Sequence, residues 1–275
     1  MGSHRIDTTP FRIDGTRPVH LSDFDPAETQ GLEDKGAKKA LGKNQERLYG
    51  LQERLYAEHK QSLLLVLQAM DTAGKDSTIR SVMSGINPQG CRIYSFKAPN
   101  SQELDRDFLW RVHERVPPKG HIGLFNRSHY EDVLIVRVHG WASPEVLEQR
   151  YTQINAFEQL LTDTGTRIIK VMLNISKDYQ LERLRRRLKR PDKLWKFNPG
   201  DLKERERWAD YMEAYEKALQ RCATPSAPWY VVPAEQRWFR NLLISQLLVD
   251  TLEDMNPQFP PAEFDPKDYP PESLR

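Results

Sequence analysis

The chain has few cysteines, no long apolar run and almost no net charge, and each shortage argues against a class of protein. Two cysteines in 275 residues cannot form a disulfide framework. The longest apolar run, residues 63–67, is too short to span a bilayer, and residues 1–10 contain no apolar signal region. With 41 basic and 39 acidic residues, the net charge of +2 does not indicate a nucleic-acid partner. We therefore expect a cytoplasmic protein without membrane or nucleic-acid partners.

What is present is an alternation of strand and helix patterns. Apolar or alternating runs predict strands at residues 62–70, 91–96, 121–126, 167–175 and 229–233. Helical patterns cover residues 37–59, 75–84, 101–116, 143–165 and 235–255. Strands that alternate with helices predict an α/β protein whose parallel sheet is covered on both faces.

No domain-sized linker interrupts this alternation. Residues 1–35 show no helix or strand periodicity and are expected to lie over the surface as an extended arm. Residues 36–256 would form the main domain. Residues 257–275 contain six prolines, which predicts an extended tail that is either a surface strap, a disordered end or a docking motif.

The first long helix contains the same five-residue word, QERLY, at residues 45–49 and 52–56. Two heptads are too few to define a coiled coil. The apolar stripe of this helix therefore packs either against its own domain or against another subunit.

Residues 65–78, LVLQAMDTAGKDST, nearly match the phosphate-binding pattern G-x-x-x-x-G-K-[ST]. Gly74 and Lys75 are in place, but Ala69 and Asp76 replace the first glycine and the serine or threonine. The segment follows a strand and precedes a helix, which favours a phosphate loop over a chance turn. Gly74 would let the backbone turn, helix amides would face an anion, and Lys75 would add positive charge.

Asp71 lies inside this loop. A carboxylate would repel phosphate there unless a cation lay between them. The residue therefore indicates Mg²⁺ coordination or proton abstraction, with a helix N-terminal cap as the alternative.

A second group of polar residues follows the third strand, at the sheet edge where ligands of doubly wound proteins bind. Arg127 could clamp phosphate oxygens with both arms of its guanidinium. Glu131 and Asp132 could bind a metal or orient a nucleophile. For His129 and Tyr130 we expect local packing and hydrogen bonding.

The third feature is a basic run in which six of the eight residues 183–190 are lysine or arginine. On a helix, Arg183, Arg187 and Arg190 fall near one face. Such a run is either a solvated face or, in a protein that also has a phosphate loop, a mobile lid over a polyanion.

Together these features resemble the polyphosphate kinase 2 family across residues 36–256. The resemblance rests on a series of motifs in family order: LLLVLQAMDTAGKDSTIRSVMSGINPQGC, SFKAPN, IGLFNRSHYEDVLIVRVHG, ISKDYQLERLRRRL, DKLWKF, DLKERERWADYMEAYE and APWYVVPA. It implies a three-layer α/β/α, P-loop kinase-like fold with a helical lid at about residues 177–205. It also implies reversible, Mg²⁺-dependent transfer of the terminal phosphoryl group of inorganic polyphosphate to AMP and ADP, which gives ADP and ATP, in a homo-oligomer.

The same resemblance assigns roles to individual residues. Those expected at the Walker A loop are Asp71, Ala73, Gly74, Lys75 and the nearby Arg80, with Asp71 as the metal ligand. Those expected at the Walker B region are Asn126, Arg127 and Glu131. Arg183 and Arg187 would hold polyphosphate from the lid, and Lys97 and Glu131 would contact the nucleotide.

Two departures from the common family pattern refine this assignment. Asn126 stands where many relatives have aspartate, and HYED replaces a WYNR-like run. The combination resembles the class III branch, whose members phosphorylate nucleoside monophosphates and diphosphates.

Two other functions remain open at this point. An ATP-dependent nucleoside monophosphate kinase would share the loop and the lid but would not need an extended basic track. A non-catalytic polyphosphate-binding protein would gain nothing from Asp71 and Glu131.

Overall fold

Five parallel strands and one short antiparallel strand form the central sheet of the computed structural model, which describes residues 5–273. In spatial order the strands are β1 (Arg12–Ile13), β6 (Trp229–Pro233), β5 (Thr166–Asn174), β2 (Ser62–Ala69), β4 (Ile122–Asn126) and β3 (Cys91–Ser95). Among the strands of residues 5–273, only β1 runs antiparallel to its neighbour. All five predicted strands are confirmed, and so is the parallel sheet.

The middle of the sheet is apolar on both faces. Every residue of β2 is buried, as its continuous apolar run predicts. Leu65 is in register with Ile169 of β5 on one side and Leu124 of β4 on the other. Because β2 and β4 are parallel neighbours, their carboxyl ends bring the phosphate-loop segment and the Arg127 segment to the same edge of the sheet.

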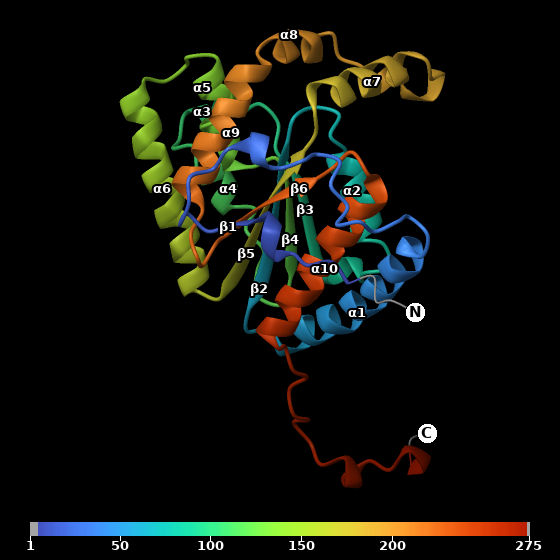
Figure 1. Ribbon diagram of the computed structural model, residues 1–275. Helices are drawn as coiled ribbons and strands as arrows, with labels where there is room; N and C mark the ends of the chain where they lie inside the picture. The colour runs from blue at the N-terminus through green and yellow to red at the C-terminus, as the bar shows by residue number, and fades with distance from the viewer. Residues whose placement is uncertain (1–4, 274–275) are drawn as a thin grey trace.

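Helices cover both faces of this sheet, which confirms the α/β/α architecture (Figure 1). On one face lie α1 (Ala37–Glu58), α2 (Lys75–Val82) and α10 (Arg237–Met255). On the other lie α4 (Trp110–His113), α5 (Ile135–Val138), α6 (Pro144–Asp163) and α9 (Trp208–Cys222), with α3 (Ser101–Leu104) close by. The lid helices α7 (Lys177–Leu188) and α8 (Gly200–Glu206) stand above the carboxyl edge of the sheet. None of the helices between residues 5 and 273 is both long and apolar enough to cross a bilayer.

The repeat in α1 serves packing within the chain. Leu48 and Leu55 are fully buried, and α1 lies along α10. The tyrosines of the two repeated words, Tyr49 and Tyr56, remain exposed. Of the two alternatives left open for the apolar stripe, the structure shows packing against its own domain.

The N-terminal arm departs from the prediction because it contributes a strand and core residues. β1 pairs with β6, and Ile6, Phe11, Val19 and Leu21 are buried. These apolar residues are too widely and irregularly spaced to show a periodicity, so the sequence pattern did not predict their burial.

The single helix predicted at residues 101–116 is wrong, because the segment forms two short helices, α3 and α4. The carboxylate of Asp107 accepts a hydrogen bond from the backbone amide of Leu109 at 3.0 Å. This side-chain turn interrupts the helix between the two pieces. The C-terminal tail leaves α10 and extends away from the body of the molecule (Figure 1).

Candidate active site

The loop between β2 and α2 has the strand–loop–helix geometry expected of a phosphate loop. Gly74, at φ +107°, precedes the first residue of α2, Lys75. A Cβ atom at Gly74 would lie 2.3 Å from Nη1 of Arg240, so the guanidinium would have to shift to admit a side chain. Thr72 also adopts a left-handed conformation, at φ +69°. Glycine is therefore favoured at position 74 by its backbone angle, and it leaves the guanidinium of Arg240 in place against the loop.

Lys75 folds back over the loop. Its Nζ donates to the carbonyl oxygen of Ala69 at 2.8 Å. Burial, assisted by the charge of Arg127, lowers the pKa of Lys75 to about 8, although Asp71 and Glu131 act in the opposite direction. An ammonium held in such surroundings is stabilised by an added anion, which is the property a phosphate-binding lysine needs.

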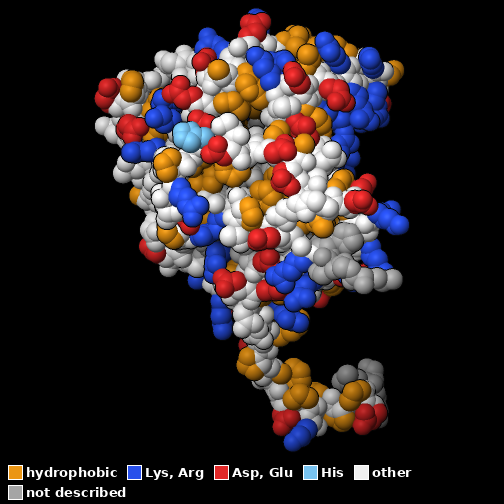
Figure 2. Space-filling model, in the orientation of Figure 1, with side chains coloured by type: hydrophobic (Ala, Val, Ile, Leu, Met, Phe, Trp, Pro, Cys, Tyr) orange, Lys and Arg blue, Asp and Glu red, His pale blue; other side chains and the backbone are white. Residues whose placement is uncertain are grey.

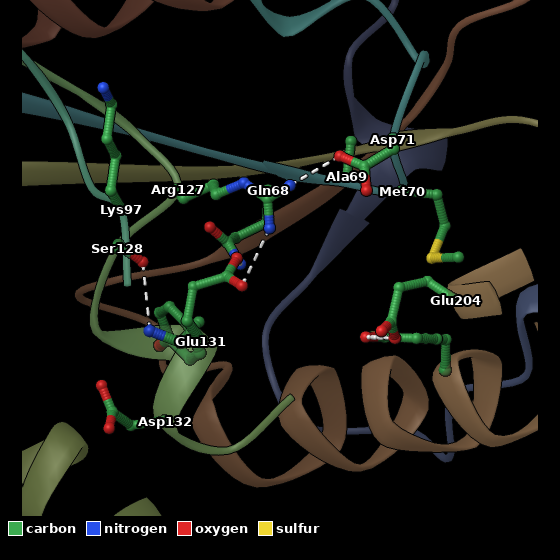
Figure 3. Close-up of polar contacts among 12 residues, drawn as sticks. Gln68, Ala69, Met70, Asp71, Lys97, Arg127, Ser128, Glu131, Asp132 and Glu204 are labelled. Carbon is green, nitrogen blue, oxygen red and sulfur yellow. Dashed lines mark hydrogen bonds and ion pairs between the residues drawn. The ribbon is translucent and has the colours of Figure 1, made fainter. Parts of the chain in front are cut away.

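Arg127 joins the two polar segments at the carboxyl ends of β2 and β4 (Figure 3). Its Nη2 lies 2.6 Å from Oδ1 of Asp71, and its Nη1 lies 3.0 Å from Oε2 of Glu131. The charge of Glu131, followed by that of Asp71, raises the pKa of Arg127 against the effect of burial. Gln68, on β2, donates to the other oxygen of Glu131 at 3.0 Å. Asp71, Arg127 and Glu131, all predicted as site residues, therefore form one cluster joined by ion pairs.

Asp76 replaces the hydroxyl residue of a standard phosphate loop and takes a connecting role. Its Oδ1 accepts a hydrogen bond from Nδ2 of Asn126 at 3.1 Å. Its Oδ2 forms an ion pair with Nζ of Lys196 at 3.0 Å. Burial would raise the pKa of Asp76, but Lys196 and Asn126 together lower it. Asp76 thus links the start of α2 to the end of β4 and to the lid.

The lid comprises α7, the 3₁₀ segment Pro191–Lys196 and α8. Arg187 donates to Oδ2 of Asp201 at 3.1 Å and to the carbonyl oxygen of Lys196 at 3.0 Å, which ties the parts of the lid together. Glu204 of α8 accepts from the hydroxyl of Tyr211 at 2.6 Å and so anchors the lid to α9. Burial and the nearby charge of Arg237 lower the pKa of Arg183. The arginines therefore face a site that favours negative charge.

A cleft of about 620 Å³ separates the loop from the lid. Ten of its lining residues are basic and two, Asp71 and Asp76, are acidic. The basic residues are Lys75, Arg80, Arg127, Arg183, Arg186, Arg187, Arg190, Lys193, Lys196 and Arg237. Figure 2 shows Lys and Arg side chains gathered on the surface over α7. In a chain of net charge +2, this concentration of cations defines a polyanion site.

Several residues considered in the sequence lie elsewhere. Lys97 is exposed, does not line the cleft, and points away from Arg127 (Figure 3). Asp132 turns away from the site toward Arg111, at 3.8 Å, rather than toward the phosphate loop. Ala73 is buried, does not line the cleft, and its carbonyl oxygen accepts a hydrogen bond from Arg240. Glu131 and Asp132 are therefore adjacent in the sequence but point in different directions, Glu131 toward Arg127 and Asp132 toward Arg111.

His129 and Tyr130 belong to a buried polar network. The hydroxyl of Tyr130 donates to Glu158 at 2.7 Å, and Nε2 of His129 lies 3.2 Å from the same carboxylate oxygen. Nζ of Lys170 lies 2.5 Å from the other oxygen of Glu158 and 3.0 Å from the hydroxyl of Tyr130. The expectation of local packing and hydrogen bonding is confirmed, and the network anchors the turn that carries Arg127 and Glu131.

Three contributors were missed from the sequence. Gln68 is fully buried beside Glu131, Lys196 binds Asp76, and Arg240 lies behind the loop. Arg240 could have been noticed in the sequence, because a charged residue at the start of the apolar run of α10 is unusual and suggests a specific partner. Gln68 is likewise a polar residue in the apolar run of β2, and Lys196 lies in the DKLWKF motif of the expected lid, but neither position alone indicates its partner.

The site offers a limited set of ligands for Mg²⁺. No group of three or more His, Cys, Asp or Glu side chains suited to a metal occurs within residues 5–273. Mg²⁺ in phosphoryl-transfer sites often takes one or two carboxylates together with phosphate oxygens and water. Arg127 occupies Oδ1 of Asp71 and leaves Oδ2 available. The residues therefore fit a magnesium ion held by Asp71 and chiefly by the substrate.

A parallel α/β/α sheet with a phosphate loop and a basic lid defines a phosphoryl-transfer protein. The family model "Polyphosphate kinase 2 (PPK2)" matches residues 31–260, so the chain belongs to the polyphosphate kinase 2 family, as the sequence motifs indicated. The crystal structure of polyphosphate kinase 2 from Arthrobacter aurescens TC1 has a TM-score of 0.92 and 46% identity, covering 95% of this chain and 94% of that one.

Two curated relatives match over nearly their whole length. The AMP/ADP-polyphosphate phosphotransferase of Meiothermus ruber is 50% identical over 255 residues, covering 92% of this chain and 96% of the relative. The ADP-polyphosphate phosphotransferase of Rhodopseudomonas palustris is 43% identical over 273 residues, covering 93% of each chain. The two names differ in the acceptor nucleotide.

Proposed function

We propose that the protein transfers the terminal phosphoryl group of inorganic polyphosphate to AMP and ADP, reversibly and with Mg²⁺. The observation that carries this proposal is the cleft in which ten basic residues face the phosphate loop. A nucleoside triphosphate has only three phosphate units to engage cations, whereas a polyphosphate chain continues with a negative charge on each further unit. The names of the Meiothermus ruber and Rhodopseudomonas palustris relatives support the same donor and acceptors.

The chain's own residues orient and neutralise the reacting phosphates. The lid and the loop hold the polyphosphate chain, with Lys75 and Arg127 closest to the end of β2. Glu131 and Gln68 fix the direction of Arg127. Magnesium held at Asp71 supplies further neutralisation of phosphate charge. Phosphoryl transfer depends mainly on such positioning and electrostatic stabilisation.

We propose both AMP and ADP as acceptors because Glu131 and Asn126 resemble the class III pattern and the Meiothermus ruber relative is named for both nucleotides.

We further propose a cytoplasmic location, where nucleotides are available, and a homo-oligomeric state. Light scattering coupled to size-exclusion chromatography measures that state directly.

The test is to mix protein, Mg²⁺, long-chain polyphosphate and AMP without ATP, and to follow ADP and ATP by chromatography. Formation of both products supports the proposal, and EDTA should abolish it. Activity only after ATP is added as donor would identify an ATP-dependent nucleoside monophosphate kinase. Polyphosphate binding without any turnover would identify a non-catalytic binding protein.

A further inference from the structure

Three lysine or arginine side chains are buried in the described part of the chain, and one of them has no carboxylate partner. Lys170 lies 2.5 Å from Glu158, and Arg111 lies 3.7 Å from Glu103. Arg240 is only 1% exposed, yet no carboxylate within residues 5–273 forms an ion pair with it. Burying an unpaired charge is costly, so this exception requires a reason.

The hydrogen bonds of Arg240 all go to neutral acceptors. Nη1 donates to the carbonyl oxygen of Ala73 at 3.0 Å, and Nη2 donates to Oγ of Ser77 at 3.1 Å. Nε and Nη2 also donate to Oδ1 of Asn241, at 3.1 and 3.0 Å. Burial, with a smaller effect of the neighbouring Arg237, lowers the pKa of Arg240 to about 10. Each of the three guanidinium nitrogens therefore has a hydrogen-bond partner, but no carboxylate balances the charge.

The guanidinium lies directly behind the phosphate loop. Gly74 and Ser77 line the cleft, while Arg240, which touches both, does not. A Cβ at Gly74 would lie 2.3 Å from Nη1 of Arg240. Only the loop therefore separates this charge from an anion bound on the front of the loop.

We propose that Arg240 is a positioning residue whose buried charge is countered by the phosphates of the bound substrate instead of by a carboxylate of the protein. The proposal rests on the proposed function, because it takes a polyphosphate as the ligand of the loop. Arg240 holds the loop at Ala73 and Ser77 and, because it is buried, attracts the phosphates with little screening by solvent. Salt weakens interactions between exposed charges far more than those of buried charges. The attraction by Arg240 therefore persists at high salt, unlike that of the exposed lid arginines.

Inorganic tripolyphosphate is the probe, and binding is measured by calorimetry at low and high salt with wild type, Arg240→Met and Arg186→Met. Arg186 is the matched control because it lines the same cleft but is exposed. Arg240→Met should weaken binding by roughly 10- to 100-fold at both salt concentrations. Arg186→Met should weaken it at low salt, with a loss that shrinks at high salt. Arg240→Lys keeps a charge and should recover part of the affinity.

Thermal unfolding without ligand separates this role from a structural one. Arg240→Met should be at least as stable as wild type, because it removes an unpaired buried charge, and tripolyphosphate should raise its melting temperature less. A less stable variant with unchanged tripolyphosphate affinity would overturn the proposal. Should Arg240→Met not fold, equal affinity of Arg240→Lys and Arg240→Gln would overturn it as well.

The same measurements distinguish failure of the role proposed for Arg240 from failure of the proposed function. A wild-type protein that binds no tripolyphosphate would refute both ideas. A wild-type protein that binds tripolyphosphate and phosphorylates AMP, beside an Arg240→Met variant of equal affinity, would refute only the role of Arg240.

Discussion

The lowered pKa of Lys75 predicts that stability and substrate binding respond to pH in opposite directions. The pKa is about 8 in the fold, against an ordinary value of 10.5. The unfolded chain therefore binds more protons than the fold between these values, and stability rises with pH across that window. Taken in full, this shift raises the free energy of unfolding by about 2 kcal/mol between about pH 7 and about pH 9.5, and the half-buried position of the side chain makes that figure an upper bound. Urea unfolding of the unliganded protein across this range measures it.

Binding of tripolyphosphate should change the other way. A bound phosphate keeps Lys75 protonated, whereas the free protein loses that proton above about pH 8. The dissociation constant should therefore be about tenfold higher at about pH 9 than at about pH 7. Lys75→Met provides the control, because it lacks the titrating group while keeping a chain of similar length. Parallel pH curves for wild type and Lys75→Met, in stability and in binding, would refute the reasoning.

Four further variants test other parts of the site. Asp71→Asn should raise the Mg²⁺ concentration needed for half-maximal rate by roughly tenfold or more, since it removes the only acidic ligand proposed; a metal titration measures this. Glu131→Asn should change the ratio of initial rates with AMP and ADP, and an unchanged ratio would place acceptor choice elsewhere. Lys170→Met should lower the free energy of unfolding by about 3 to 5 kcal/mol, because it leaves Glu158 buried without its cation. Arg186→Ala should raise the KM for polyphosphate and leave kcat nearly unchanged, with a loss that falls as salt is added.

Elements set by local pattern could be predicted from the sequence. The apolar run of β2, the glycine before α2 and the strand–helix alternation each depend on neighbouring residues, and each appears where it was predicted. The break between α3 and α4 could not be predicted from helical periodicity, because it coincides with a local turn in which the Asp107 side chain accepts from the amide of Leu109. A single side-chain turn leaves almost no trace in a periodic pattern.

The active site was predictable in its residues but not in its contacts. Asp71 and Lys75 were identified from the near-match to the phosphate-loop pattern, and Arg127 and Glu131 from their place after the third predicted strand, where ligands of doubly wound sheets bind. The ion pair between Arg127 and Asp71 joins residues 56 positions apart, and the bond from Arg240 to the loop spans 167 positions. Such pairs depend on how layers of the fold meet, which periodicity does not encode.

The cations around the cleft fall into two groups that differ in how the free protein counters their charge. Arg127, Arg187 and Lys196 each have a carboxylate partner that fixes the side chain in one direction. Arg186 and Arg237 form no ion pair within the described residues and line the same cleft. A cation already held in place loses little conformational freedom when the substrate arrives and so contributes orientation. An unpaired cation is free to add affinity at the cost of its own ordering. Because one cleft contains both groups, substitutions in the first should act mainly on kcat and substitutions in the second mainly on KM.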